Sequence, residues 1–130
     1  MKRILLACFL LAGAASVAPT QHASAYSAAA PVTVASFTAK VNLMDSQIGA
    51  GSMTAAQATW EEIHTMMLSV LGVTKNSIYT APTPAAKTAY ETILNNQTVI
   101  YQAAWNLKPN LATNRALIKA KLLEFAATIY

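Results

Sequence analysis

Apolar side chains recur every three or four positions along four stretches of this chain, the spacing that lines one face of an α-helix. The stretches cover residues 34–48, 54–71, 84–107 and 110–129. Their stripes are Phe37, Val41, Met44 and Ile48; Trp60, His64, Met67 and Leu71; Tyr90, Ile93, Gln97, Ile100, Ala104 and Leu107; and Ile118, Leu122, Phe125 and Ile129. We find no convincing strand, so the pattern predicts an all-α domain.

Residues at the ends of these stretches predict where each helix begins and ends. Thr54 with Gln57 makes a capping box that begins the second helix, and Gly72 ends it. Thr83 followed by Pro84 begins the third helix, since proline fits the first helical position. Lys108-Pro109 ends the third helix, because the residue before a proline avoids the helical conformation.

Short joins after the first and third helices make their neighbours antiparallel. The sequence therefore predicts a small four-helix bundle of up-down-up-down topology. The connection from Val73 to Pro82 is the longest of the predicted joins, and it leaves room for either a turn or a crossover.

The first 25 residues have the three parts of a secretory signal. Lys2 and Arg3 precede an apolar run over residues 4–18, and Ala23-Ser24-Ala25 provides small residues for cleavage. We expect a cleavable signal peptide over 1–25, a flexible lead-in over 26–33 and the bundle over 34–130. The protein is then exported, to the periplasm or the medium, with no stable membrane span once the signal is removed.

Removing the signal changes the charge and the cysteine content. The whole chain has nine Lys and Arg, five Asp and Glu, and one Cys. Lys2, Arg3 and Cys8 belong to the signal, which leaves seven cations, five anions and no cysteine. So small an excess of positive charge argues against nucleic-acid binding, which needs a dense basic surface.

His64 is the only histidine after the signal, which limits the chemistry that the domain can support. A di-iron bundle needs two Glu-x-x-His motifs, and only Glu61-x-x-His64 occurs. A triad of Asp45, His64 and a serine is formally possible, but no nucleophile motif accompanies it. We therefore predict that the protein is not an enzyme and carries no cofactor.

One alternative is a haem or copper carrier that uses His64 with Met44 or Met67. Imidazole plus thioether suits Cu(I), or haem iron with His/Met ligands. In size and ligand pair the chain resembles exported four-helix cytochromes of the b type. Their ligands come from the first and last helices, whereas the last predicted helix here has neither His nor Met.

A second alternative comes from Met53-Thr54-Ala55-Ala56-Gln57, which resembles the Leu-Thr-x-x-Gln motif of exported stress chaperones built from helical hairpins. That resemblance implies a periplasmic stress chaperone. Those proteins are highly charged and carry the motif twice, whereas this chain is poor in charge and carries it once.

The surface composition favours a third hypothesis, which we prefer. Only twelve charged residues remain after the signal, so the solvent-facing sides must consist largely of Ala, Thr, Asn, Gln and Ser. Such a surface resists association less than a charged one. We expect a binding or structural module that contacts an unknown protein partner or itself, with Trp60, Trp105, Tyr101 and Tyr130 as candidate anchors.

Overall fold

The computed structural model describes residues 30–130, so the predicted signal peptide (1–25) and most of the predicted lead-in lie outside the described residues. The helices are α2 (Val34–Gly49), α3 (Met53–Thr80), α4 (Pro84–Leu107) and α5 (Arg115–Ala126), with a short 3₁₀ helix, η1 (Lys108–Asn110), after α4. This part of the chain contains no strand. The compact unit they form spans Val32–Tyr130.

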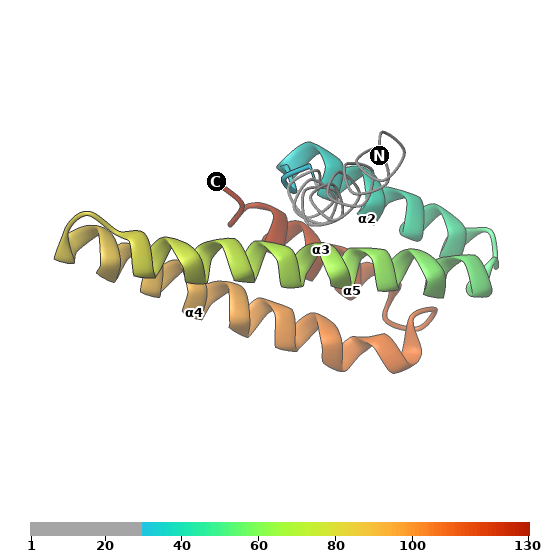
Figure 1. Ribbon diagram of the computed structural model, residues 1–130. Helices are drawn as coiled ribbons and strands as arrows, with labels where there is room; N and C mark the ends of the chain where they lie inside the picture. Colours follow the sequence, from blue (N-terminus) through green and yellow to red (C-terminus); the bar gives the residue numbers. More distant parts are fainter. Residues whose placement is uncertain (1–29) are drawn as a thin grey trace, which may run out of the picture. The chain divides into compact units, whose positions relative to one another are not determined.

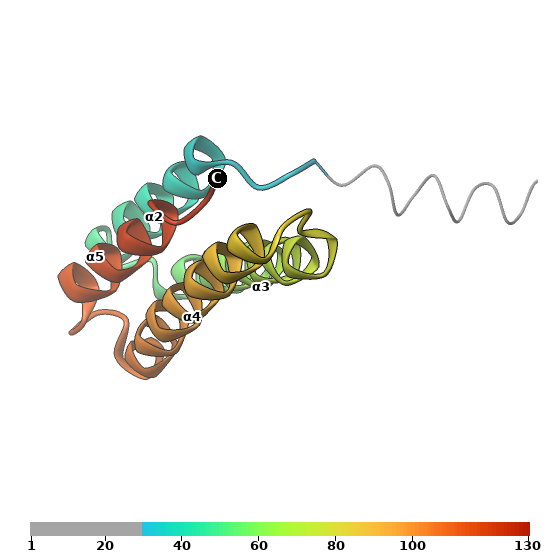
Figure 2. The ribbon, with the colours of Figure 1, turned by 90° about the vertical axis from the view of Figure 1, so that its left-hand side faces the viewer.

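The four helices pack in a closed ring. Each helix contacts the one before and after it in the chain, and α5 returns to contact α2 (Figure 1, Figure 2). Since the chain reverses at each link, the arrangement is the up-down-up-down four-helix bundle that the apolar pattern predicts.

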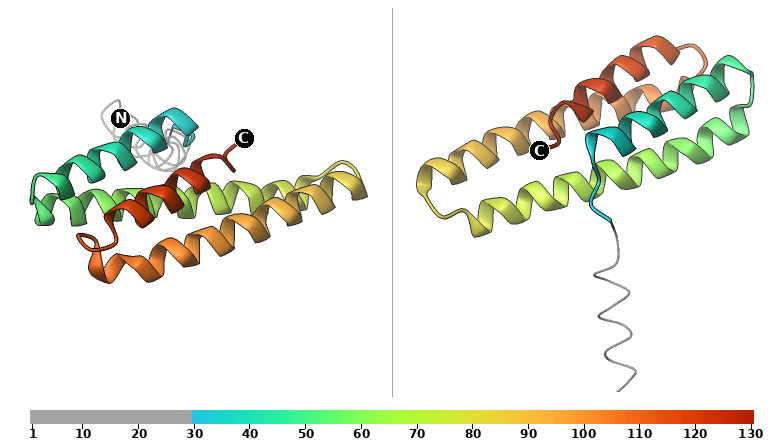
Figure 3. Two further views of the ribbon diagram at one scale, coloured as in Figure 1. Left: turned by 180° about the vertical axis from the view of Figure 1, so that it is seen from behind. Right: turned by 90° about the horizontal axis from the view of Figure 1, so that it is seen from above.

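The helices differ in length, and this shapes the bundle. α3 has 28 residues and α4 has 24, whereas α2 has 16 and α5 has 12. At a rise of about 1.5 Å per residue, α3 is roughly 18 Å longer than α2. The end of the α3–α4 hairpin around residues 75–91 therefore projects past α2 and α5 (Figure 1, Figure 3). We call this end the hairpin tip.

The core lies inside the ring and contains most of the predicted stripe residues, but His64 and Leu71 of the second stripe are only half-buried, and Ile63 and Val70 face the core in their place. All four stripe residues of α2 are buried, and Ile118, Leu122 and Phe125 of α5 are fully or almost fully buried. The rings of Phe37 and Phe125 stack across the core with centroids 5.5 Å apart. Burying each such side chain contributes about 1.5–3 kcal/mol, so these contacts hold the helices together.

Several predicted helix ends are confirmed. The Thr83 side chain accepts a hydrogen bond from the backbone N–H of Ala86, and Pro84 is the first residue of α4. α4 ends at Leu107, directly before Lys108-Pro109. Thr33 and Ser36 form a capping box at the start of α2 that the pattern did not predict.

The prediction that Gly72 ends the second helix is wrong. α3 continues through Gly72 to Thr80, and only residues 81–83 separate it from α4, so the connection is a short link without a crossover. Val70 and Thr74 are buried on either side of Gly72. A glycine inside a helix costs about 1 kcal/mol, and the continuation past it buries Thr74 fully and Ile78 in part.

The predicted first residues of two helices are also wrong. α3 begins at Met53 rather than after Thr54, because the carbonyl of Ser52 already accepts the N–H of Ala56 at 2.9 Å. The last helix begins at Arg115 rather than near 110, since the chain between them forms η1 and turns.

None of the helices in residues 30–130 combines the length and the apolar character needed to cross a membrane.

Candidate functional site

Two stripes of side chains meet where α3 and α4 lie side by side, flanking the core-facing side of each helix. Both stripes step by three and four residues, the spacing of one helix face. We call this line the outer seam. It consists of Glu61, His64, Leu68, Leu71, Lys75 and Ile78 on α3, and of Lys87, Glu91, Leu94, Thr98, Tyr101, Trp105 and Lys108 on α4 and its C-terminal end.

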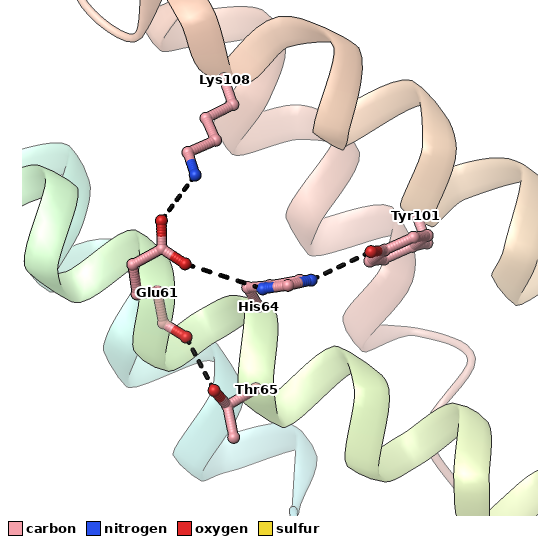
Figure 4. A network of polar contacts seen from close by, with 5 residues as sticks. All are labelled: Glu61, His64, Thr65, Tyr101 and Lys108. Atoms are coloured by element: carbon pink, nitrogen blue, oxygen red, sulfur yellow. Dashed lines mark hydrogen bonds and ion pairs between the residues drawn. The ribbon is translucent and has the colours of Figure 1, made fainter.

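A chain of polar contacts crosses the outer seam at His64 (Figure 4). The Nζ of Lys108 donates to Glu61 Oε1 at 2.5 Å, and the other carboxylate oxygen lies 3.7 Å from His64 Nδ1. On the far side of the ring, His64 Nε2 lies 3.0 Å from the hydroxyl of Tyr101. The helices α3 and α4 are thus joined by polar contacts at this level.

The charge on Glu61 decides the orientation of this network. Hydrogen bonding from the Lys108 ammonium holds the pKa of the Glu61 carboxyl below its ordinary value, so this group is a carboxylate at neutral pH. A carboxylate only accepts, and therefore favours the proton of a neutral His64 on Nδ1. At 3.7 Å this preference acts through charge rather than through a hydrogen bond, and in that tautomer Nε2 accepts from the Tyr101 hydroxyl.

Carboxylate, imidazole and hydroxyl occur here in the same order as in hydrolase triads, with Tyr101 in the place of the nucleophile. The adjacent groove is lined by Gln57, Ala58, Glu61, Lys108, Pro109 and Leu111. This lining includes the carboxylate of Glu61 but not the Tyr101 hydroxyl. The network therefore has the geometry to orient the His64 and Tyr101 rings, and the absence of catalysis stays a prediction.

Three rings cluster at the same level. The centroid of His64 lies 4.7 Å from that of Trp105 and 5.8 Å from that of Tyr101, and the Lys108 ammonium lies 4.8 Å from the Trp105 ring centroid. Each such aromatic pair contributes about 0.5–1.5 kcal/mol beyond its burial. Trp105 keeps 39% of its surface exposed. The result is a fixed aromatic surface open to solvent.

The two methionines predicted as ligands occupy a different environment. Met44 and Met67 are fully buried in the core, whereas His64 lies on the outer seam with both ring nitrogens facing partners. A metal ion or haem iron at His64 has to displace Tyr101 or Glu61. Within residues 30–130, no three His, Cys, Asp or Glu side chains gather as a metal site.

Of the four aromatic residues predicted to anchor an interface, Trp60 needs correction. Its side chain is fully buried in the core because it lies on the inward stripe of α3. Tyr101 and Trp105 lie together on the outer seam. Tyr130 is 62% exposed but packs on its own chain: its ring is 5.7 Å from that of Tyr90, and its hydroxyl donates to Ser77 Oγ at 3.1 Å.

Asp45, the formal triad candidate, pairs with a different helix. Its carboxylate accepts from Arg115 Nε at 2.7 Å and from Lys119 Nζ at 3.0 Å, which ties α2 to α5. The Arg115 guanidinium lies 2.7–2.9 Å from where a Cβ on Gly49 would be, so glycine makes room for this approach. Asp45 therefore stabilises the bundle rather than orienting His64.

Replacing Asp45 with asparagine should lower the stability in a pH-dependent way. Hydrogen bonds from Arg115, and then from Lys119, lower the pKa of Asp45 from 3.8 to about 2. A lowered pKa means that the pair stabilises the fold fully above about pH 4 and loses this effect as the pH falls to about 2. Because the pair is partly solvent-screened, Asp45→Asn should cost about 1 kcal/mol at pH 7.

The measurement is urea unfolding of both proteins at pH 7 and pH 2.5. Glu124→Gln is the matched control, since Glu124 pairs only within α5 and is half exposed. The Glu124→Gln substitution should lower the free energy of unfolding by less than about 0.5 kcal/mol. An Asp45→Asn cost that is equal at both pH values contradicts the assignment.

Comparisons with protein-family models, with curated proteins and with solved structures find no match to this chain. Neither the cytochrome nor the chaperone resemblance gains support from them.

Some residues of the site were missing from the sequence-based prediction. Glu61 and Lys108 position the His64 ring, and Leu68 is the exposed apolar residue one turn beyond it. The signal that could have found them is the three-four spacing on both helices, read as a pair of stripes that face each other.

Proposed function

We propose that this protein is exported and works without catalysis, by contacting another protein through the outer seam of its α3–α4 hairpin. Residues 1–25 support the export. The observation that supports the contact most directly is the exposure of Trp105 and Leu68, 39% and 48%, in one seam. Exposed tryptophan beside aliphatic residues is typical of surfaces that carry binding energy.

The fixed geometry of the aromatic cluster also supports this proposal. The Trp105 ring is held between His64 and Lys108, and Tyr101 is hydrogen-bonded. A side chain that is already ordered loses little conformational entropy when a partner binds, so more of the contact energy appears as affinity. A half-exposed tryptophan that already contacts two neighbouring side chains is therefore suited to be an interface anchor.

A photo-crosslinking amino acid at Leu68 tests the proposal in the exported fraction of the cells that produce the protein. Leu43 on α2 is the matched control position, since it is 44% exposed and lies outside the seam. We expect a discrete crosslinked product from position 68 and none from position 43. Mass spectrometry of the product tells whether the partner is a different protein or a second copy of this chain.

A further inference from the structure

A depression of about 500 Å³ lies at the hairpin tip, where the outer seam ends. It is lined by Lys75, Ile78, Tyr79, Ala81, Lys87, Glu91 and Leu94. Ile78 and Leu94 are half-buried, and Tyr79 is 77% exposed. The depression therefore combines an apolar lining with two ammonium groups and an open aromatic ring.

The positive charge of this depression is not fully compensated within the described residues. Lys75 has no ion pair in residues 30–130. Lys87 faces Glu91 only at 3.9 Å, at the limit of an ion pair, and both side chains are about half exposed. The depression thus has two ammonium groups and one carboxylate in its lining, and that carboxylate is paired only loosely, with Lys87.

The chain itself has no spare carboxylate side chain to fill this site. All five Asp and Glu side chains lie in residues 30–130, and each is already in an ion pair. Residues 1–29 contain no Asp or Glu. A second copy or the N-terminal segment could therefore offer a side-chain carboxylate only by breaking an existing pair.

We propose that the hairpin tip binds an acidic segment of another protein, one that places a carboxylate between Lys75 and Lys87 and apolar side chains on Ile78 and Leu94. This inference rests on the proposed contact function and names the chemistry of the partner. Complementary charge fixes the register and speeds association, while the apolar lining supplies affinity.

The tip is continuous with the aromatic part of the outer seam. Leu94, Thr98 and Tyr101 follow one another at the spacing of one face of α4 and lead from the tip to Trp105. A helical partner segment can lie with its apolar face along such a row of side chains. The acidic residue then sits at the tip and the apolar residues follow toward Trp105.

Two synthetic peptides test this chemistry on the ¹⁵N-labelled protein. One is acetyl-(Glu-Leu-Ala-Glu-Leu-Ala) amide, and the other has glutamine in place of glutamate. The acidic peptide should shift the amide resonances of residues 75–94. We expect at least about tenfold weaker binding for the glutamine peptide, and for the acidic peptide with Lys75→Glu. Lys121→Glu is the control, since Lys121 lies on α5 and pairs with Glu124.

Three results overturn the proposal: no binding of the acidic peptide at about 1 mM, equal binding of both peptides, or an equal loss with Lys121→Glu. Shifts that centre on α2 or α5 overturn it as well. The crosslink at Leu68 is independent of these outcomes. If position 68 crosslinks a partner but the acidic peptide does not bind, the contact function stands and the acidic-segment proposal fails. If the acidic peptide binds as expected but position 68 gives no crosslink, the contact function fails and the charge preference of the tip stands.

Discussion

Replacing Trp60 with alanine will lower the free energy of unfolding by about 3–5 kcal/mol, the usual cost of truncating a buried aromatic side chain. Trp60 is fully buried and belongs to the one core shared by all four helices. A domain of this size has about 5–15 kcal/mol of stability in total, so the variant should be close to unfolding at room temperature. Urea denaturation followed by circular dichroism measures the change.

The second tryptophan provides the control. Trp105→Ala removes a half-exposed ring and its contacts with His64 and Lys108, so it should cost only about 1–2 kcal/mol. Trp60→Phe should cost less than Trp60→Ala, because it keeps an aromatic ring and removes a buried Nε1–H that has no acceptor among the described residues. Similar costs for Trp60→Ala and Trp105→Ala contradict the placement of Trp60 in the core.

Replacing Gly72 with proline will destabilise the bundle by about 3 kcal/mol or more, whereas alanine at the same position will stabilise it by about 0.5–1 kcal/mol. Both effects follow from the position of Gly72 inside α3. Proline removes a helical hydrogen bond and clashes with the preceding turn. Alanine removes the entropic cost of glycine, and its Cβ meets no atom within 4 Å.

The sign of the stability change in Gly72→Ala distinguishes a helix α3 that continues through Gly72 from one that ends there. If the helix ended at Gly72 in a left-handed conformation, alanine would be strained there and the stability would fall. Gly51 provides the matched comparison, because its φ is +74°. Gly51→Ala should therefore cost about 1 kcal/mol while Gly72→Ala stabilises. Thermal unfolding of both variants and of the parent protein shows whether each substitution raises or lowers the unfolding temperature.

The sequence was sufficient to predict the fold class and four helices, because each helix has a one-sided apolar stripe. It failed at Gly72, since a glycine signal is local while the continuation of α3 depends on the packing of the residues that follow, Thr74 and Ile78. Packing between elements decides such cases, and a single helix does not reveal it. The start of α3 was missed by one or two residues for a local reason, because the carbonyl of Ser52 already accepts a helical hydrogen bond from Ala56.

The candidate site was predictable only in part. Tyr101 and Trp105 were named as candidate interface anchors, and His64 was named as the only histidine after the signal and a candidate ligand. Their meeting on one seam depends on the register between α3 and α4, which the spacing within either helix does not fix. Trp60 was named both in the apolar stripe of the second helix and as a candidate anchor, because the sequence does not tell whether an aromatic residue faces the core or a partner, and the structure buries it fully.

The crosslink at Leu68 tests the central claim most directly, when its yield is compared with that at Leu43 in otherwise identical proteins. We predict a product of defined mass from position 68 whose yield falls by about tenfold or more with Trp105→Ala, since truncating an anchor residue costs 2 kcal/mol or more of binding energy. Position 43 should give no such product. Equal yields at the two positions, or a product that persists unchanged with Trp105→Ala, would contradict a contact surface at the outer seam.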